Sequence, residues 1–389
     1  MLRVLVNDRC LCQNAAGVGM YLRNLLAAWP AGGSKLELFW THSPLPTPHS
    51  LLPTRPRLPP LALCPLRDLR APGTLARPPW LARRMVQRWR GWRFARRYRG
   101  GGFAAYFEPN HIAYPCDGPT VTTIHDLSVL DHPEWHPADR VRQWDASLKA
   151  TMKQTAGWIT DSRFSAGRME SVLSIPPERI SVIPLAGRAL PYPPRAEALA
   201  MTKSWGLPPQ FILHVGTIEP RKNIAALLEA HAKLPAARHR SCPLVLAGGR
   251  GWGSARFWQE LTGHRAAADA LTCGYVSDAH AAVLLSAAAA VVAPSRYEGF
   301  GLPVLEAFAA GTPVICSDIP PFREIAEGCA EMIDPLDASA WAAAMIRAME
   351  DDSWRQDRVK AGMIRAGRYS WAAAAAAHER VLAEAARKA

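Results

Sequence analysis

The chain of 389 residues lacks any apolar run close to the roughly 20 residues that a membrane-spanning helix needs. The N-terminal sequence MLRVLVNDRC has a short apolar run that ends at Asn7 and Asp8, so it is expected to form a first strand and not a signal peptide. The eight cysteines are scattered, and no C-x-x-C pair with metal-ligand spacing occurs. We therefore expect reduced thiols, a cytoplasmic protein and no metal site.

Acidic residues are absent where basic residues gather most densely. The net charge is +13, and the segment that begins at Arg83 and ends at Arg99, RRMVQRWRGWRFARRYR, contains eight arginines and no acid. Such a balance indicates an anionic partner, which could be nucleic acid, a phosphorylated substrate or membrane headgroups. At helical spacing the arginines fall on all sides, which does not make a clean amphipathic membrane helix. A solvated basic surface and a contact with anionic lipid therefore both remain open.

Short apolar runs alternate with helical stretches in both halves of the chain. The first half contains LRVLV, LELFW, AAYF, TVTTI, GWIT and ISVIP, and the second contains FILHV, LVLAG, LTCGY, AVVAP and PVICS. Short continuous runs with Gly or Pro at their ends are typical of buried parallel strands. Their alternation with helices predicts two doubly wound α/β domains with a cleft between them.

Proline-rich segments mark the expected domain limits. Residues 187–210 are rich in proline and lack strand character, which indicates a boundary between a first domain at 1–190, a linker at 191–210 and a second domain at 211–370. Residues 43–79 are also proline-rich and are expected to form a long surface excursion of the first domain. The alanine-rich residues 371–389 are expected to form a terminal helix.

Two glutamates flank a glycine turn in RYEGFGLPVLEAFAAGTPVICSD. Pro303 suits the first turn of a helix, so we expect a helix to begin near Leu302, just after the strand AVVAP. The N-terminus of that helix would favour a phosphate at the edge of the sheet. Glu306, on the first full turn, could accept hydrogen bonds from ligand hydroxyls, and Glu298 would lie nearer the group beyond the phosphate. The structural alternative is a solvent-facing carboxylate and a helix-dipole partner.

Polar residues follow two other predicted strands. Arg221 and Lys222, in GTIEPRKN, precede a helix that Asn223 could cap, and two adjacent cations suit a diphosphate. His125 and Asp126 follow TVTTI at the same kind of edge. A solvated loop pair is the structural alternative for the two cations, and a capping or space-filling role is the alternative for the histidine and the aspartate.

Glycines open the helix expected after the first strand, in NAAGVGMYLRNLL. Gly17 and Gly19 do not complete the G-x-G-x-x-G fingerprint, so nicotinamide binding is not supported, and they could serve only close helix packing. Four further residues also follow strands and are weaker candidates for lining an acceptor site: Asn110, His111, Ser162 and Arg163.

Together these motifs resemble a known enzyme family. GTIEPRKN, LAGG, GYVSD and PSRYEGFGLPVLEAFAAGTPVI resemble the retaining glycosyltransferases of the GT-B fold, family four, whose signature is the paired glutamates. GVGMYLRNLL and TIHDLSVLDHPEWHPADR are similar to the mannosyltransferase branch of bacterial polysaccharide assembly. The resemblance implies an α/β GT-B fold of two Rossmann-like domains that face a cleft, with a C-terminal helix that crosses back to the first domain.

The resemblance also implies roles for single residues at the donor. Arg221 and Lys222 would hold the diphosphate of a nucleotide sugar, and the amides near Leu302 would contact a phosphate. Glu306 would bind the ribose hydroxyls. Gly17 would let the first helix approach the diphosphate when the cleft closes.

Further implied roles concern the transferred sugar and the base. Glu298, with the backbone of Phe300 and Gly301, would hold hydroxyls of the sugar, and His125 would face the sugar near the reacting carbon. The base would lie near two residues, Tyr275 and Val276.

The implied activity is transfer of a hexose without a cofactor or metal. GDP-mannose is the first choice of donor, although rhamnose or glucose donors stay open. The acceptor would be an oligosaccharide or a lipid-linked glycan for exopolysaccharide or O-antigen, reached at the inner face of the cytoplasmic membrane. The alternatives are a sugar-nucleotide epimerase, a non-catalytic sugar-nucleotide sensor and a basic nucleic-acid-binding protein. The last leaves the paired glutamates unexplained, so no nucleic acid partner is expected.

Overall fold

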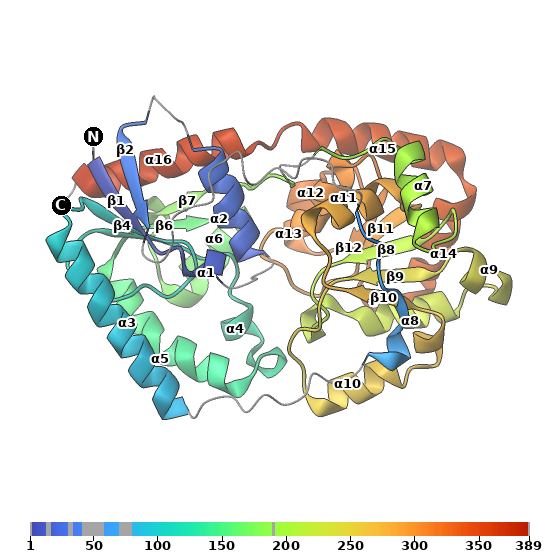
Figure 1. The fold of residues 1–389 in the computed structure, drawn as a ribbon, viewed down its shortest axis with the longest axis horizontal. Coiled ribbons are helices and arrows are strands. Elements are labelled where there is room, and N and C mark those ends of the chain that lie inside the picture. Colours follow the sequence, from blue (N-terminus) through green and yellow to red (C-terminus); the bar gives the residue numbers. More distant parts are fainter. Residues whose placement is uncertain are drawn as a thin grey trace. The chain divides into compact units, whose positions relative to one another are not determined.

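The computed structural model describes residues 2–12, 17–29, 34–40, 58–69, 80–188 and 191–387. They fall into two compact units. Unit 1 takes the described residues within 1–52, 71–185 and 370–389, and unit 2 takes those within 53–70 and 186–369. Each unit is built on one largely parallel sheet with helices packed against it (Figure 1). Within the described ranges no helix is both long enough and apolar enough to cross a bilayer.

The sheet of unit 1 has six parallel strands in the order β2-β1-β4-β5-β6-β7. Their bounds are β1 Leu2–Val6, β2 Leu36–Trp40, β4 Ala105–Glu108, β5 Thr120–Thr123, β6 Thr155–Thr160 and β7 Ile180–Val182. The chain moves outward from β1 to β2 and then returns to β4 on the other side of β1. The loops on the two sides of such a reversal diverge, and open α/β sheets bind ligands in the crevice between these loops.

Helices of unit 1 pack against this sheet. They are α1 Arg9–Cys12, α2 Val18–Ala27, α3 Trp80–Gly100, α4 Ser128–Asp131, α5 Ala138–Gln154, α6 Arg163–Leu173 and α16 Trp371–Arg387, with short 3₁₀ turns at Pro133–Trp135 and Pro177–Arg179. The C-terminal helix α16 contacts α2 and strands β1, β4, β5 and β6 (Figure 1), which confirms that the end of the chain returns to the first domain. Its His378 Nε2 lies 2.7 Å from the buried hydroxyl of Tyr21 on α2.

The sheet of unit 2 has seven strands in the order β13-β12-β11-β8-β9-β10-β3. Their bounds are β3 Cys64–Pro65, β8 Ile212–Val215, β9 Leu244–Ala247, β10 Leu271–Gly274, β11 Ala290–Ala293, β12 Val314–Ser317 and β13 Glu331–Ile333. All pairs are parallel except that of β10 with β3. Here the chain order reverses between β8 and β11.

Helices cover this second sheet and close its core. They are α7 Arg195–Ser204, α8 Ile224–Ala232, α9 Ala236–Ser241, α10 Ala255–Thr262, α11 Asp278–Ala287, α12 Leu302–Ala309, α13 Pro320–Ala326, α14 Ala338–Glu350 and α15 Asp352–Ala366, with 3₁₀ turns at Leu66–Asp68, Pro220–Lys222 and Arg265–Ala268. The fully buried Trp341 of α14 packs in the same core as Ile212 and Leu244.

The sequence pattern predicted eleven of these strands and missed two, β3 and β13. Strand β3 pairs antiparallel with β10 in unit 2, so the expectation that residues 43–79 form an excursion of the first domain is wrong for the residues described there. Pro65 is tolerated because β3 is an edge strand, where a missing N–H costs little. The proline-rich stretch expected to be a linker contains helix α7, which packs against α11.

Candidate active site

The first cluster of site residues lies at the strand reversal of unit 2. Arg221 and Lys222 stand in the 3₁₀ turn after β8, and Glu298 stands in the loop after the neighbouring strand β11. Lys222 Nζ donates to Glu298 Oε1 at 2.5 Å, and Arg221 Nη1 donates to Glu298 Oε2 at 2.6 Å. Ser295 Oγ also donates to Glu298 Oε1, at 2.7 Å. The structure thus joins the two motifs that the sequence placed in separate loops.

The charges in this cluster balance one another. Burial would raise the pKa of Glu298, but Arg221 and Lys222 outweigh it and lower the pKa to about 2. Glu219 Oε1 lies 2.5 Å from Arg221 Nε, and burial raises the pKa of Glu219 in spite of the two cations. Glu298 is therefore ionised at neutral pH and holds the basic pair in place. An incoming diphosphate would have to share these cations with the carboxylates.

Helix α12 begins at Leu302, as predicted, and its N-cap is Gly301. Gly301 has a φ of 117°, and a Cβ there would lie 2.6 Å from the ring of Phe322, so only glycine fits the turn. The preceding Phe300 is buried, and its ring packs edge-on against Tyr369. The amides that the sequence analysis assigned to a phosphate are thus held by a rigid turn.

The second signature glutamate, Glu306, is enclosed by residues that the sequence analysis did not single out. Arg188 Nε lies 3.2 Å from Glu306 Oε2, and Arg188 Nη1 donates to Asp278 at the start of α11. Tyr192 follows on the same segment as Arg188, and its hydroxyl is buried. Burial raises the pKa of Glu306 to about 7, because the nearby Asp278 adds to the effect and Arg188 offsets it only in part.

The positions assigned to the base also lie in unit 2. Tyr275 and Val276 follow strand β10 and precede α11. The side chain of Val276 is buried, whereas Tyr275 is 64% exposed. A large exposed aromatic ring is an available stacking surface for a purine or pyrimidine.

Unit 1 carries a row of polar side chains at the carboxyl ends of adjacent strands. Asn7 follows β1, and its Nδ2 donates to Glu108 Oε2, at the end of β4, over 2.7 Å. His125 follows β5, and its Nδ1 lies 2.6 Å from Asp161 Oδ2, just after β6. Sequence reasoning found His125 but missed Asp161, although an acidic residue directly after the strand run GWIT was the available signal.

Both ring nitrogens of His125 have acceptors inside unit 1. Nδ1 faces the Asp161 carboxylate, and Nε2 lies 3.1 Å from the carbonyl oxygen of Pro109. Burial would lower the pKa of His125, but Asp161, together with the Pro109 carbonyl and Asp126, outweighs burial and raises the pKa. Both ring nitrogens therefore lie within hydrogen-bond distance of an acceptor, and burial raises the pKa of the partner carboxyl of Asp161 although His125 offsets it in part.

Several weaker candidates serve the local backbone. Asp126 Oδ1 accepts from the amide and hydroxyl of Ser128, and Ser162 caps α6 through the amide of Ser165. Asn223 stands at the N-cap of α8 but does not cap it, because its side-chain amide donates to the carbonyls of two prolines, Pro294 and Pro335.

The remaining candidates of unit 1 keep their predicted places at strand and helix ends. Gly17 is the N-cap of α2, with a φ of 78°. His111 is buried beside Trp144, and burial lowers its pKa to about 3. Asn110 donates its amide to Glu108. No contact described here tests the ligand roles of these residues, which stay predictions.

Comparison with known proteins gives matches over both units. The family model described as Glycosyl transferases group 1 matches residues 201–365, and the model described as Glycosyltransferase Family 4 matches residues 15–186. The chain is 38% identical over 254 residues to O-antigen chain mannosyltransferase B of Escherichia coli, covering 64% of this chain and 66% of that protein. It is 26% identical over 292 residues to serotype-specific mannosyltransferase WbdA of Escherichia coli, covering 69% of this chain and 34% of that protein. The chain thus spans about two thirds of the first relative and about a third of the second.

Solved structures share the fold at low identity. Sucrose-phosphate synthase from Thermosynechococcus elongatus superposes with a TM-score of 0.73 at 21% identity, covering all of both chains. Anabaena Alr3699/HepE in complex with UDP and glucose gives a TM-score of 0.66 at 15% identity, covering 99% of this chain and all of that one. The fold of the two units defines a GT-B protein. The chain belongs to the family 4 glycosyltransferases, in which the group 1 domain forms the second half.

Proposed function

We propose that this glycosyltransferase moves mannose from GDP-mannose, with retention of configuration, to an oligosaccharide or lipid-linked glycan of O-antigen or exopolysaccharide. The observation that carries the proposal is the Arg221–Lys222–Glu298 cluster at the strand reversal of unit 2, where a basic pair is fixed beside the N-terminus of α12. The names of the mannosyltransferase relatives support the sugar and the pathway class. We place the reaction in the cytoplasm, at the inner face of the membrane.

The proposed step breaks the bond between the sugar C1 and the β-phosphate oxygen. The acceptor oxygen bonds to C1 on the same face, and its proton passes to the leaving phosphate oxygen. Negative charge grows on the diphosphate, and Arg221, Lys222 and the α12 amides stabilise it without a metal. Glu298 holds the two cations, so its contact with the sugar would add to a role that the structure already supports.

Turnover of a donor panel tests the proposal. The purified protein is incubated with GDP-, UDP-, ADP- and dTDP-sugars, with and without a membrane lipid extract, and release of nucleoside diphosphate is followed. Glu298→Ala and Arg221→Ala are the test variants, and Arg256→Ala, which removes an exposed side chain of the same unit, is the matched control. A parallel arm contains EDTA to test metal independence.

We expect release from GDP-mannose alone, stimulated by the extract, lost in the two site variants and unchanged in the control and with EDTA. Loss of activity with EDTA would contradict the metal-free step. Binding of nucleotides without turnover would favour the non-catalytic sensor, and turnover of another donor would replace mannose as the transferred sugar.

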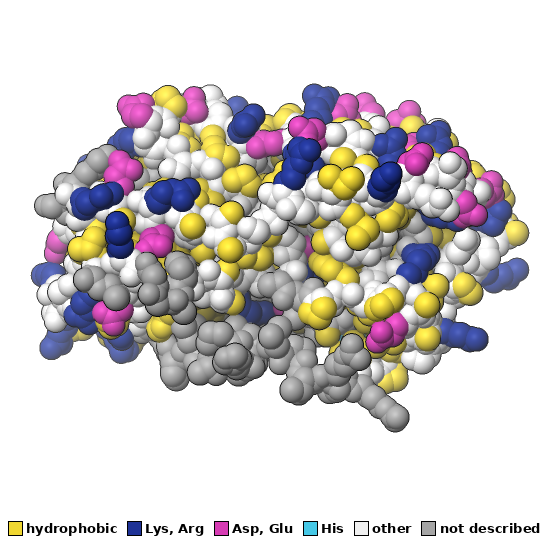
Figure 2. All heavy atoms as spheres, turned by 90° about the horizontal axis from the view of Figure 1, so that it is seen from above, with side chains coloured by type: hydrophobic (Ala, Val, Ile, Leu, Met, Phe, Trp, Pro, Cys, Tyr) yellow, Lys and Arg dark blue, Asp and Glu magenta, His cyan; other side chains and the backbone are white. Residues whose placement is uncertain are grey.

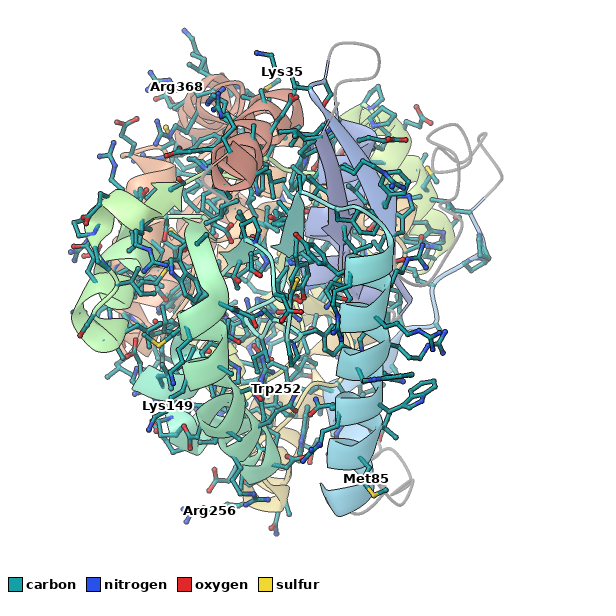
Figure 3. The ribbon with its side chains drawn as sticks, turned by 90° about the vertical axis from the view of Figure 1, so that its left-hand side faces the viewer. Lys35, Met85, Lys149, Trp252, Arg256 and Arg368 are labelled. Carbon is teal, nitrogen blue, oxygen red and sulfur yellow. The ribbon has the colours of Figure 1, made fainter. Side chains whose placement is uncertain are left out.

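We also propose that helix α3 contacts anionic lipid. Its inner side packs through the buried Phe94 and Tyr98, whereas Met85, Trp89 and Trp92 are each more than half exposed and lie at helical spacing on one stripe. Residues 80–100 contain no acidic residue, whereas basic and acidic side chains are interspersed on the face shown in Figure 2. Figure 3 shows α3 along its length, with Met85 near one end of the helix. Exposed tryptophans flanked by arginines suit the interface of an anionic bilayer.

Partitioning onto vesicles tests this contact. Charge reversal at Arg88, Arg93 and Arg97 should abolish binding to vesicles that contain phosphatidylglycerol, because each basic residue contributes about 1 kcal/mol near such a surface. Reversal of three exposed arginines in unit 2 is the matched control: Arg256, Arg265 and Arg323. Unchanged partitioning of the α3 variant would refute the contact, and steeply salt-dependent binding to duplex DNA in its place would revive the nucleic-acid alternative.

A further inference from the structure

The surroundings of Glu306 contain buried polar atoms that the described residues leave without a hydrogen bond. They are Glu306 Oε1 and the Tyr192 hydroxyl, and Arg188 Nε lies beside them, 3.2 Å from Glu306 Oε2. Buried polar atoms in proteins are nearly always hydrogen-bonded. Glu306 is only 1% exposed, and the Arg188 side chain is 13% exposed. Such a cluster is built to receive a ligand with hydroxyl groups.

We propose that Arg188 is a positioning residue that holds the Glu306 carboxylate toward the ribose diol of the donor nucleotide, with the Tyr192 hydroxyl as an additional contact to that diol. This inference rests on the proposed function and deepens it. A diol fits because it can donate two hydrogen bonds to the open carboxylate oxygen and accept one from a phenol. The segment that carries Arg188 and Tyr192, which sequence analysis took for the domain boundary, thereby becomes part of the donor site.

The packing around Arg188 fixes its direction. Gly187 packs against the backbone of Glu306, where an added Cβ would lie 3.5 Å from the Glu306 Cα. Arg188 then reaches between two carboxylates, Glu306 on α12 and Asp278 at the first position of α11. Because the guanidinium is planar and presents donors on two edges, it can bridge both. Lysine at this position would reach one carboxylate but not both.

The charged and titratable groups that face Glu306 are Arg188, Asp278 and Tyr192. Arg188 favours the ionised carboxylate, and Asp278 disfavours it. Only the ionised form leaves both oxygens as acceptors, so affinity for a ribose should fall as the pH drops through the pKa of Glu306. Removing Arg188 should move the pH at which ribose affinity falls to a higher value, and removing the charge of Asp278 should move that pH to a lower value.

Calorimetric binding of GDP and 2′,3′-dideoxy-GDP between pH 6 and pH 9 tests the inference. The proteins are wild type, Arg188→Met, Arg188→Lys, Asp278→Asn and Tyr192→Phe. At pH 7.5 we expect Arg188→Met to weaken GDP binding about 10-fold or more, since a hydrogen bond to a charged group is lost, and dideoxy-GDP binding by less than about 3-fold. Arg188→Lys should recover part of the loss, and Tyr192→Phe should cost about 3-fold for GDP alone.

The decisive readout is the pH at which GDP affinity has fallen by half. This pH should shift in opposite directions in Arg188→Met and Asp278→Asn, because a purely structural role would shift neither. Equal losses for GDP and dideoxy-GDP, or midpoints that move together, would overturn the inference while leaving the proposed function intact. If Arg188→Met does not fold, Arg188→Lys and Asp278→Asn carry the same test. Wild-type protein that binds none of GDP, UDP or ADP would instead overturn the proposed function, and the inference with it.

Discussion

The two signature glutamates lie in the same unit with seven residues between them, yet their surroundings are opposite. Glu298 accepts hydrogen bonds from Arg221, Lys222 and Ser295, and its pKa is lowered to about 2. Glu306 faces Arg188 at 3.2 Å, and its pKa is raised to about 7 by burial. The same residue type thus has two roles. Glu298 completes an ion cluster in which both of its oxygens are bonded, whereas Glu306 keeps one carboxylate oxygen without a hydrogen bond from the described residues.

Replacing Glu298 by alanine should give the largest effect on folding. It would leave the buried Arg221 and Lys222 without the carboxylate that both contact, although Glu219 still pairs with Arg221, and removing one partner of a buried pair costs about 3–5 kcal/mol. The measurement is the shift in the urea unfolding midpoint. Glu350→Ala, which breaks an exposed pair with Arg238, is the control and should cost less than about 1 kcal/mol. Equal costs for the two variants would show that the Glu298 cluster is no more than a surface pair.

Replacing His125 by alanine should distinguish the contribution of unit 1 to turnover from that of unit 2 to donor binding. We expect turnover to fall about 100-fold, the usual scale for losing a positioned charged or proton-transferring group. GDP affinity should stay within about 2-fold, since the glutamates and the basic pair all lie in unit 2. Steady-state kinetics and calorimetry on the same preparation measure both. A parallel loss of GDP affinity would show that the donor site depends on His125.

The pH dependence of stability should distinguish the glutamates by sign. Glu298 has a folded-state pKa below its ordinary value of 4.5, so its contribution is fully present above about pH 4.5 and is lost as the pH falls toward 2. Glu306 has a folded-state pKa above 4.5, so its contribution is lost as the pH rises from about 4.5 through about 7.

Between pH 4.5 and pH 7.5 the difference in unfolding free energy between Glu298→Gln and wild type should therefore stay nearly constant. Glu306→Gln should gain about 3 kcal/mol of unfolding free energy relative to wild type over the same range. Urea unfolding of the three proteins at four pH values within that range measures both trends. Parallel trends would mean that the two carboxylates do not differ in the way that their contacts indicate.

The alternation of apolar runs was enough to predict the two sheets, because strands buried on both faces are written as short continuous Val, Ile and Leu runs. It missed β3 and β13, which lie at the two edges of one sheet, since Cys64 and Pro65 look like loop residues and EMI carries a charge. Edge strands bury less and so leave a weaker pattern.

The site shows the same limit. Motifs next to strand ends could be found because the glycines and the adjacent cations are local signals. Arg188 was not singled out, and Asp278 entered only as the last residue of the motif GYVSD. Their partnership with Glu306 joins segments about 90 and 120 residues away from Arg188, and only the packing of α11 and α12 brings these together. Asp161 had a local signal, because it directly follows the strand run GWIT, but its pairing with His125 depends on the neighbouring strand.

The smallest expected effect concerns the exposed Tyr275. If its ring stacks on the base, Tyr275→Ala should weaken GDP binding about 5-fold, at the low end of base–aromatic stacking, because the residue is largely exposed to water. Tyr275→Phe should bind as wild type, since stacking needs only the ring. The loss should be the same for dideoxy-GDP and at every pH, because the base carries neither the diol nor a group that titrates with Glu306. If Tyr275→Ala weakened binding of GDP but not of dideoxy-GDP, Tyr275 would contact the ribose hydroxyls and not the base. The ribose site would then include Tyr275 in addition to the buried residues around Glu306.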